Sequence, residues 1–448
     1  TDTDADTDVD TDTDTDTDTD TGLVTCDTTG PTHLWISPDD SASTVSPVRA
    51  RSSWGAPIRT HEFLNYYTPD YPPAVMGEVA LHAGMVALGP DRYELQLAVA
   101  SPVVTRATRR PMDLVLSMDT SGSMTGTPIS RARSVCTAIA SSLRAGDRVA
   151  MVEWASTQNV LLPVRTVNGP NDPVLLGACT SLTTTGGTNL SAGLQAAYNI
   201  ANTLWSTGRD TRVVLVSDGG ANLGVTDASL IGQNALMAGA DGIYMTGVGV
   251  GAAFYNDALM DEVTDLGRGA AVFVDSANEA NKMFRDRFIQ VMTVAARDVE
   301  IELELPPGFA IEASSAEGIS TQPNVLPPQN LAYDDAMVVY NRVTTCDPSL
   351  ATDEATVTAT VTWAHPTTFL PQVTTHTWTL GELLDATGLD PAIAKGRAVF
   401  LYAEALAHPL PGPGHVSAAE AEQAVALALV LTPGDADLLA IQAHLQTL

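Results

Sequence analysis

Five short apolar stretches between residues 111 and 294 alternate with segments of helical character, and this alternation constrains the fold more than any other feature. The stretches are "DLVLSM", "RVAMVEW", "TRVVLVS", "GIYMTGVGV" and "AAVFVD". Strands separated by helices form a mainly parallel sheet with helices over both faces, so the region is predicted as a doubly wound α/β domain. "NVLLPV" follows the second stretch too closely for a crossover helix, which predicts an antiparallel strand.

The first helix of this region illustrates the pattern. Apolar residues recur at three- and four-residue steps after Pro128, a residue that fits a first helical turn. We expect Thr127 to cap this helix and Gly146 to end it.

A different periodicity flanks the central region on both sides. In "RYELQLAVA" apolar residues alternate with polar or small ones, and the same period returns in "VEIELELPPG", "ATVTATVTW" and "QVTTHTWTL". Such alternation is typical of half-buried strands. Because these strands are split by the central region, they predict one antiparallel β-domain into which the α/β domain is inserted.

The two ends of the chain differ in character. Residues 1–21, almost entirely Thr and Asp, offer nothing to a core and repel one another, which predicts an extended, disordered spacer. The last 60 or so residues indicate helices, with starts at Asp390–Pro391 and at a capping box of Ser417 and Glu420. We therefore expect a spacer (1–21), an N-terminal flanking segment with β-domain strands (22–110), the α/β domain (111–294), a β-sandwich-like continuation (295–380) and a small C-terminal helical segment (381–448).

Aromatic residues are concentrated before the first strands. Phe63, Tyr66, Tyr67 and Tyr71 lie close together in a chain with only 5% aromatic residues. A short helix over residues 60–67 is predicted to carry them up to the following prolines. We interpret this cluster as a plug between domains and not as a ligand platform.

Charge narrows the range of partners. The formal charge is −31, and −21 remains when the ten aspartates of the spacer are set aside. An acidic surface repels polyanions, so nucleic acid is not an expected partner. No apolar run reaches the roughly 20 residues that cross a bilayer, so we expect no transmembrane segment. Residue 1 is threonine, which indicates a leader that was removed or omitted.

The four cysteines, Cys26, Cys136, Cys179 and Cys346, have no spacing typical of zinc sites. In an extracytoplasmic protein they would form two disulfides, for which we favour Cys136 with Cys179 and Cys26 with Cys346. Buried free thiols are the alternative, because cysteine is often buried without a partner. The sequence leaves both open.

Three loops of the predicted α/β domain carry side chains with oxygen atoms. One follows "DLVLSM", one contains "GGTNLSAGL" and one follows "TRVVLVS". Loops at the carboxyl ends of parallel strands converge on one crevice. None of these side chains offers nitrogen or sulfur, which favours a hard divalent ion, Mg²⁺, with Mn²⁺ or Ca²⁺ as alternatives. Only two of the donors are acidic, so we expect the ion to keep a position for a carboxylate from another molecule. The predicted ligands are Asp119, Ser121, Ser123, Thr188 and Asp218.

The segments "DTSGSM", "GGTNLSAGL" and "SDGGAN", in this order, resemble the metal-ion-dependent adhesion site (MIDAS) of the von Willebrand factor type A (VWA) domain. The resemblance covers residues 111–290 and implies a Rossmann-like fold. It implies that Ser121, Ser123 and Thr188 touch the metal directly, while Asp119 and Asp218 hold it mostly through water. The family usually has valine where Thr120 stands, and we expect that side chain to point away from the ion.

The flanking sequences resemble those of bacterial exported VWA proteins. "EFLNYYTPDYPP" and "NDALMDEVTDLGRGAAVFVDSANEANKMF" carry this likeness, and the Thr-Asp tract resembles the spacers that follow the lipidated cysteine of surface lipoproteins. Cys26, in "LVTC", is a poor lipidation context, so a lipid anchor would lie upstream of residue 1. The resemblance implies an extracytoplasmic protein that is secreted or located at the outer surface or in the periplasm.

Enzymatic sites are not expected. Ser121 stands where a phosphotransfer site would have a second carboxylate, no G-x-S-x-G elbow is present, and none of the eight histidines lies in the α/β domain. We therefore expect no catalytic or organic-cofactor residues. The predicted function is metal-dependent protein binding or adhesion, with an Asp or Glu of a protein ligand on the metal. The alternative is a structural component of an extracellular assembly in which the metal site is secondary.

Overall fold

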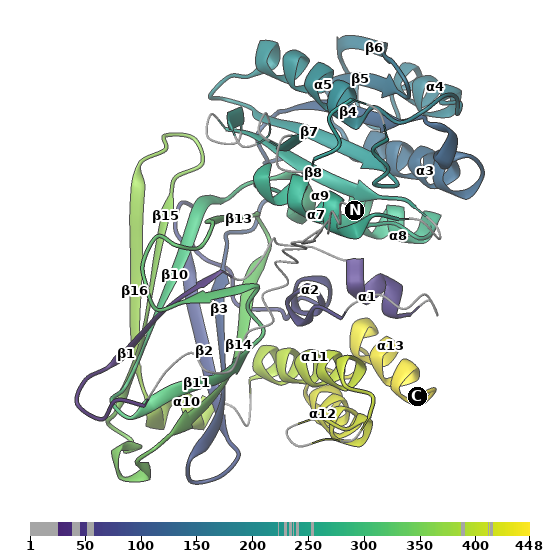
Figure 1. The fold of residues 1–448 in the computed structure, drawn as a ribbon. Helices are drawn as coiled ribbons and strands as arrows, with labels where there is room; N and C mark the ends of the chain where they lie inside the picture. The colour runs from purple at the N-terminus through teal and green to yellow at the C-terminus, as the bar shows by residue number, and fades with distance from the viewer. Residues whose placement is uncertain are drawn as a thin grey trace, which may run out of the picture.

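The protein folds as an α/β domain, a β-sandwich and a layer of C-terminal helices, all visible in Figure 1. The computed structural model describes residues 26–37, 45–51, 58–222, 224–227, 231–232, 235, 237–238, 242–251, 255–386, 390–410, 412 and 415–448. The predicted spacer, 1–21, lies outside the described residues.

One six-stranded sheet forms the centre of the α/β domain. Its order is β6-β5-β4-β7-β8-β9, and every neighbouring pair is parallel except β5 and β6. The predicted doubly wound α/β class and the antiparallel strand at "NVLLPV" are therefore confirmed. The strands are β4 (Met112–Asp119), β5 (Arg148–Trp154), β6 (Gln158–Thr166), β7 (Asp210–Ser217), β8 (Ile243–Gly249) and β9 (Ala271–Phe273).

Helices cover both faces of this sheet because successive strand residues point to opposite sides. Leu114 and Leu116 of β4 belong to the core with α3, whereas Val115 belongs to the core with α5 and α7. The helical segments are α3 (Thr127–Ser142), α4 (Pro173–Ser181), α5 (Leu190–Leu204), α7 (Asp257–Leu266), α8 (Ala277–Asn281), the π-helix η2 (Lys282–Asp286) and α9 (Phe288–Met292).

Both predicted ends of α3 are wrong by a few residues. Thr127 is already helical, and Gly126 holds the N-cap position with φ +87°. The helix ends at Ser142, and Leu143 turns to extended backbone before Gly146. Gly146 serves the following turn instead, where its φ of +92° suits a residue without a Cβ.

Two antiparallel sheets, built from strands before and after the α/β domain, form the sandwich. Their orders are β11-β14-β3-β2 and β12-β1-β10-β15-β16, and β13 also pairs with β10. Leu34, Leu97, Leu303, Val339 and Val361 meet in the core between them. The predicted insertion is thus confirmed as part of the fold class. The strands are β1 (Thr32–Ser37), β2 (Ala80–Ala87), β3 (Arg92–Ala100), β10 (Ala296–Leu305), β11 (Phe309–Ser314), β12 (Gly318–Ser320), β13 (Gln329–Leu331), β14 (Ala336–Thr345), β15 (Thr356–Ala364) and β16 (Pro371–Thr379).

The C-terminal segment is helical, as predicted. Asp390 caps α11 through its side chain, and Ser417 with Glu420 forms the expected capping box of α12. Among the described residues, no helix is long and apolar enough to span a membrane. The helices are α10 (Leu380–Ala386), α11 (Pro391–Ala407), α12 (Ala418–Leu431) and α13 (Ala436–Leu445).

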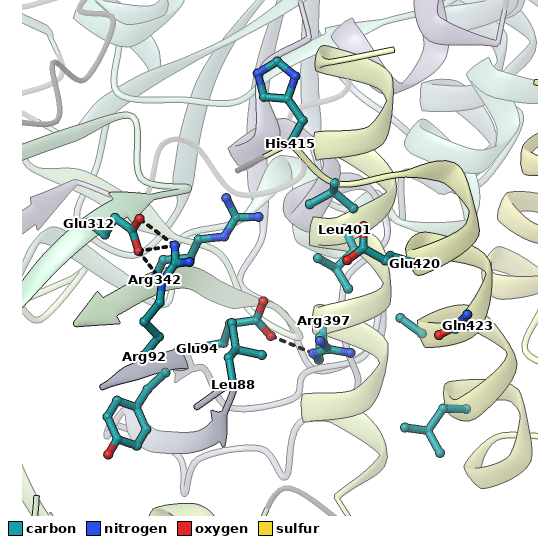
Figure 2. Close-up of a pocket in the computed structure, with 14 residues that line it drawn as sticks. Leu88, Arg92, Glu94, Glu312, Arg342, Arg397, Leu401, His415, Glu420 and Gln423 are labelled. Carbon is teal, nitrogen blue, oxygen red and sulfur yellow. Dashed lines mark hydrogen bonds and ion pairs between the residues drawn. The ribbon is translucent and has the colours of Figure 1, made fainter. Parts of the chain in front are cut away.

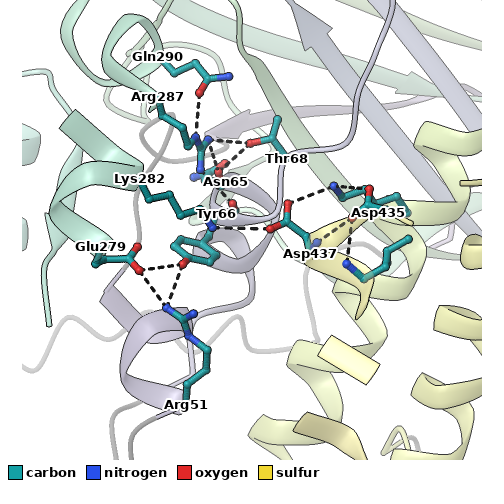
Figure 3. A network of polar contacts seen from close by, with 12 residues as sticks. Arg51, Asn65, Tyr66, Thr68, Glu279, Lys282, Arg287, Gln290, Asp435 and Asp437 are labelled. Atoms are coloured by element: carbon teal, nitrogen blue, oxygen red, sulfur yellow. Dashed lines mark hydrogen bonds and ion pairs between the residues drawn. The ribbon is translucent and has the colours of Figure 1, made fainter. Parts of the chain in front are cut away.

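The aromatic segment lies between the α/β domain and these helices, as its interpretation as a plug requires (Figure 1). Helix α2 (Thr60–Tyr66) follows α1 (Val45–Ala50), and the ring of its Phe63 meets Tyr402 of α11 edge to face at 5.6 Å. On the other side, the Tyr66 hydroxyl donates to Glu279 of α8 over 3.2 Å, and the Lys282 ammonium lies 3.6 Å from the Tyr66 ring (Figure 3).

Both favoured disulfides are present. Cys136–Cys179 joins α3 to α4, and Cys26–Cys346 joins the segment that precedes β1 to the residue after β14. All four cysteines are therefore paired. Stable disulfides are characteristic of proteins outside the cytosol, which is consistent with an extracytoplasmic location.

Candidate metal-binding site

The first loop of the candidate site begins where β4 ends. Asp119 is the last residue of that strand and is fully buried. Its Oδ1 accepts a hydrogen bond from the Ser121 amide at 2.8 Å. The hydroxyls of Ser121 and Ser123 lie 3.1 Å apart, so alternate residues of the loop project to the same side. Ser121 is buried and Ser123 is exposed, which gives the loop an inner and an outer oxygen.

The second loop, between α4 and α5, is held against the first by backbone hydrogen bonds. The Thr185 amide donates to the Thr120 carbonyl over 2.7 Å, and the Gly122 amide donates to the Gly186 carbonyl over 3.1 Å. Thr188 comes 69 residues after Asp119 in the sequence. The pairing of the two loops brings it to the carboxyl end of β4.

The third loop follows β7 and is tied to the second. Asn222 accepts the Thr188 amide through its side-chain Oδ1 at 2.9 Å, and its own amide donates to the Thr188 carbonyl at 3.1 Å. Asp218 begins this loop and accepts the Gly220 amide at 3.1 Å. The three loops thus form one hydrogen-bonded layer over the carboxyl ends of β4 and β7.

Three of the predicted ligands surround Gly220. A Cβ placed on Gly220 would lie 3.1 Å from Oδ1 of Asp218, 3.8 Å from Oγ of Ser123 and 3.8 Å from Cγ2 of Thr188. Together with the Asp119–Ser121 and Ser121–Ser123 contacts, this geometry connects all five predicted side chains. The structure therefore brings together every residue that the sequence nominated.

The electrostatics of the site are dominated by the burial of Asp119. Burial raises the pKa of Asp119 to about 7, and the neighbouring Asp218 carboxylate adds to this effect, although hydrogen bonds from Ser121 and Ser217 oppose it. A divalent ion would favour the ionised form of this carboxyl. Two acids and three hydroxyls also match the all-oxygen ligand set that Mg²⁺ prefers.

This site is poor in anions. Among the described residues, no group of three or more His, Cys, Asp or Glu side chains is arranged to hold a metal ion. The five-residue set contains only two carboxylates, so any ion held there depends on neutral hydroxyls.

Two supporting residues were missed by sequence reasoning. The Ser217 hydroxyl donates to Oδ2 of Asp119 over 2.7 Å and accepts the Gly219 amide over 3.0 Å. Asn222 joins the second and third loops, as described above. Ser217 belongs to an apolar strand and Asn222 to a polar loop, and neither position differs in sequence from an ordinary strand end or turn. Thr120 behaves as expected: its hydroxyl donates to the Trp154 carbonyl, away from the site.

A separate cavity of about 600 Å³ lies between the β-sandwich and the C-terminal helices (Figure 2). None of its lining residues belongs to the three loops. Its charged groups largely satisfy one another, since Arg397 pairs with Glu94 at 2.7 Å and Arg92 pairs with Glu312 at 2.6 Å. The cavity is therefore lined by paired charges of both signs and lacks the converging oxygen atoms of the loop site.

Comparisons with known proteins support the resemblance to the von Willebrand factor type A domain. The family model described as "von Willebrand factor type A domain" matches residues 114–221, which include all five predicted ligands. The chain is 27% identical over 268 residues to the uncharacterized protein YfbK of Escherichia coli, covering 57% of this chain and 46% of YfbK. It is 24% identical over 220 residues to the uncharacterized protein sll0103 of Synechocystis, covering 48% and 50%. The chain thus spans about half the length of the curated relatives it matches.

Solved structures include similar folds at low sequence identity. A von Willebrand factor type A protein from Catenulispora acidiphila aligns with a TM-score of 0.46 and 17% identity, covering 85% of this chain and 89% of that one. The pilus adhesin SpaC from Lactobacillus rhamnosus GG aligns with a TM-score of 0.34 and 13% identity, covering 67% and 48%. At these scores the family assignment rests on the sequence match alone.

Proposed function

We propose that this chain, which carries a von Willebrand factor type A domain over residues 114–221, binds a protein partner through a divalent metal ion held by Asp119, Ser121, Ser123, Thr188 and Asp218. The bound Mg²⁺ would supply an electrophilic centre for a carboxylate of the partner. The chain's own contribution is to hold five oxygens in place and to leave the outer side, at Ser123, open to solvent.

The convergence of the three loops around Gly220 is the observation that carries this proposal. Five oxygen donors from β4, from the loop before α5 and from the end of β7 meet, and the loops are fixed by backbone hydrogen bonds. Because only two donors are charged, the ion retains affinity for a third carboxylate. An Asp or Glu of another protein supplies that group.

The charge of the chain adds a condition on the partner. The net charge of −31 repels an acidic protein at long range. The metal ion therefore attracts a partner's carboxylate only when the two are in contact. The rest of the partner's surface is expected to be neutral or basic. This requirement favours binding that depends strictly on the metal.

Two disulfides support a location outside the cytosol, at a cell surface, in the periplasm or in the extracellular space. Binding of a protein ligand by metal in that setting is adhesion or assembly. No catalytic role is part of the proposal.

The metal site is tested on the full chain with Mn²⁺ as the probe. Electron paramagnetic resonance should show one bound Mn²⁺ per chain, displaced by Mg²⁺ and removed by chelator. Ser121→Ala should abolish this binding. Ser134→Ala should leave it unchanged, because Ser134 is a partly exposed serine of α3 whose hydroxyl donates to its own helix. Equal binding by the two variants would refute the site.

The open position is tested by adding carboxylate to the Mn²⁺-loaded chain. The relaxation of bulk water by the bound ion should fall when a peptide containing Asp or Glu is added, because the carboxylate displaces water. A peptide with Asn or Gln at the same place is the control. Identical responses to both peptides would contradict carboxylate recognition.

A second candidate function is that of a structural component of an extracellular assembly, with contacts made by the β-sandwich. One observation favours it: the edge strand β16 is exposed over most of its length.

A further inference from the structure

Among the described residues, six strands stand at the ends of the three strand orders, and five of them carry features that protect against pairing with another chain. Strands β9 and β12 have only three residues each. Helix α10 packs against β2. Strand β11 is interrupted by a register shift at Glu312, and β6 contains Pro163 and pairs with β5 through two register shifts. Short strands, bulges, proline and charge are the usual devices that keep sheet edges from associating.

The sixth edge, β16, has none of these devices along its middle. It pairs with β15 in a continuous register from Thr356–Thr379 to Ala364–Pro371. Its sequence, PQVTTHTWT, contains no Asp, Glu, Lys or Arg, and its only proline is its first residue. Six of its nine residues are exposed, and the Val373 side chain retains 65% of its accessible surface. In Figure 1 the strand forms the outer margin of the sandwich.

The outward face of this edge is a ladder of hydroxyls. Thr358 and Thr377 lie 3.0 Å apart through their Oγ1 atoms, and Thr360 and Thr375 lie 3.1 Å apart. Thr362 stands opposite Val373 in the next pair. Threonine and β-branched residues directly opposite one another are favourable cross-strand pairs. A further strand with threonine or β-branched residues, added beside β16, would form the same kind of cross-strand pairs.

We propose that β16 pairs with β16 of a second copy of this chain, antiparallel, to join two sheets into one. A second copy is the occupant that the charge pattern favours. The nearest row of acids on this face, Glu300, Glu302 and Glu304, lies on β10, two strands inward. In the pair, the two β10 strands would stand five strand spacings apart, or about 24 Å, which exceeds the Debye length of about 8 Å at physiological salt. Two copies of this acidic chain can therefore pair through β16, because that strand carries no acidic side chain.

The symmetry of such a pair fixes its register. A two-fold axis at Thr375 places Thr375 opposite its mate and Val373 opposite Thr377 of the second copy. Residues 372–378 are then paired. This register leaves Thr379 outside, which is consistent with its amide and hydroxyl being bound by Glu382 of α10. A two-fold interface of this kind closes on itself and gives a dimer and no fibre.

The expected affinity is modest. A single strand pair lies at the small end of specific interfaces, below about 1,200 Å² of buried surface. We expect a dissociation constant of about 10 to 100 μM. Sedimentation velocity of the full chain, from about tenfold below to about tenfold above that range, should show the 46.9 kDa monomer convert to a species of twice the mass.

Thr375→Lys tests the interface directly. The substitution places two ammonium groups opposite each other across the two-fold axis, and should weaken the dimer at least about tenfold because like charges directly opposite repel. Thr360→Lys is the matched control, with the same charge on the same face but one strand further in. It should change the dissociation constant by less than about threefold.

A cross-link gives an independent readout. With Thr375→Cys, the two sulfurs would lie across one strand spacing, within the range in which disulfides form, and mild oxidation should yield a covalent dimer. With Thr360→Cys, the mates would be about 14 Å apart and should remain monomeric. The native cysteines do not interfere, since all four are already paired.

Three results would overturn the proposal. They are a chain that stays monomeric throughout the concentration range, a dimer that Thr375→Lys leaves intact, and equal cross-linking of the two cysteine variants. Chelator separates this proposal from the metal site, because the strand pair contains no predicted metal ligand. A dimer that persists in chelator supports it, whereas a dimer lost in chelator would assign the contact to the loops and overturn it.

Discussion

The hydroxyl of Ser217, the last residue of β7, donates a hydrogen bond to Oδ2 of Asp119, the last residue of β4, over 2.7 Å. This bond crosses between two parallel neighbours at the carboxyl edge of the sheet. It leaves Oδ1 of Asp119 to accept the Ser121 amide, so both oxygens of the carboxylate are held. The carboxylate of Asp119, the first predicted ligand, is therefore oriented by the sheet as well as by its own loop.

Removal of this bond should weaken metal binding. Ser217→Ala leaves the fully buried Asp119 carboxylate without one of its hydrogen-bond donors. The loss of a hydrogen bond to a charged group costs about 1 to 3 kcal/mol. We expect the affinity for Mn²⁺ to fall by about tenfold. Isothermal titration calorimetry measures the Mn²⁺ affinity of each variant. Ser217→Thr, which keeps the hydroxyl, should bind nearly as the parent does, and a parent-like Ser217→Ala would contradict the role.

Gly220→Ala should obstruct the site itself. The new Cβ would lie 3.1 Å from Oδ1 of Asp218 and face Ser123 and Thr188. We expect weaker Mn²⁺ binding with little change in thermal stability, because the added methyl meets ligands and no core residue. Gly208→Ala is the control, since nothing lies within 4 Å of its Cβ position. A stability loss equal to the binding loss would point to a folding defect instead.

Acid sensitivity should arise in part from His61. Burial lowers the pKa of His61 to about 4. The neutral ring is thus favoured in the folded state, and its stabilising contribution is complete above pH 6.5 and lost as the pH falls towards 4. The shift sets an upper limit of about 3 kcal/mol on this loss.

The measurement compares the thermal midpoints of the parent and of His61→Gln at neutral pH and near pH 4.5. We expect the parent to lose more stability than the variant over this range, because only the parent must protonate an imidazole whose pKa is lowered in the folded state. His408→Gln, at an exposed position, should follow the parent. Parallel curves for all three proteins would disprove the contribution of His61.

Loss of the Cys136–Cys179 disulfide should destabilise the α/β domain. The bridge closes a loop with a sequence separation of 43 and joins two fully buried side chains. Replacement of both residues by alanine is expected to cost about 2 to 5 kcal/mol, measured by denaturant unfolding. The Cys26→Ala/Cys346→Ala protein serves for comparison, because that bridge ties the sandwich and should leave Mn²⁺ binding unchanged. An undiminished unfolding free energy in the first variant would show that the bridge adds nothing.

The sequence by itself determined the helices and strands, and it predicted which side chains would bind a metal ion. The two periodicities separated the α/β domain from the sandwich strands, because side-chain spacing along a strand or helix reflects which face is buried. Asp119, Ser121 and Ser123 were found together since they share one loop. Thr188 and Asp218 were predicted because loops at the carboxyl ends of parallel strands converge, and the family resemblance pointed to the same two residues.

Only the tertiary structure decided how these pieces meet. Ser217 and Asn222 gained their roles from neighbours on other strands and loops, and no local pattern marks such partners. The cysteine pairing, left open between disulfides and free thiols, was settled by the approach of α3 to α4 and of residue 26 to β14. The exposure of β16 likewise depends on which strand lies at a sheet margin. Local sequence sets what each segment can bury, but contacts between distant segments arise only when the chain has packed.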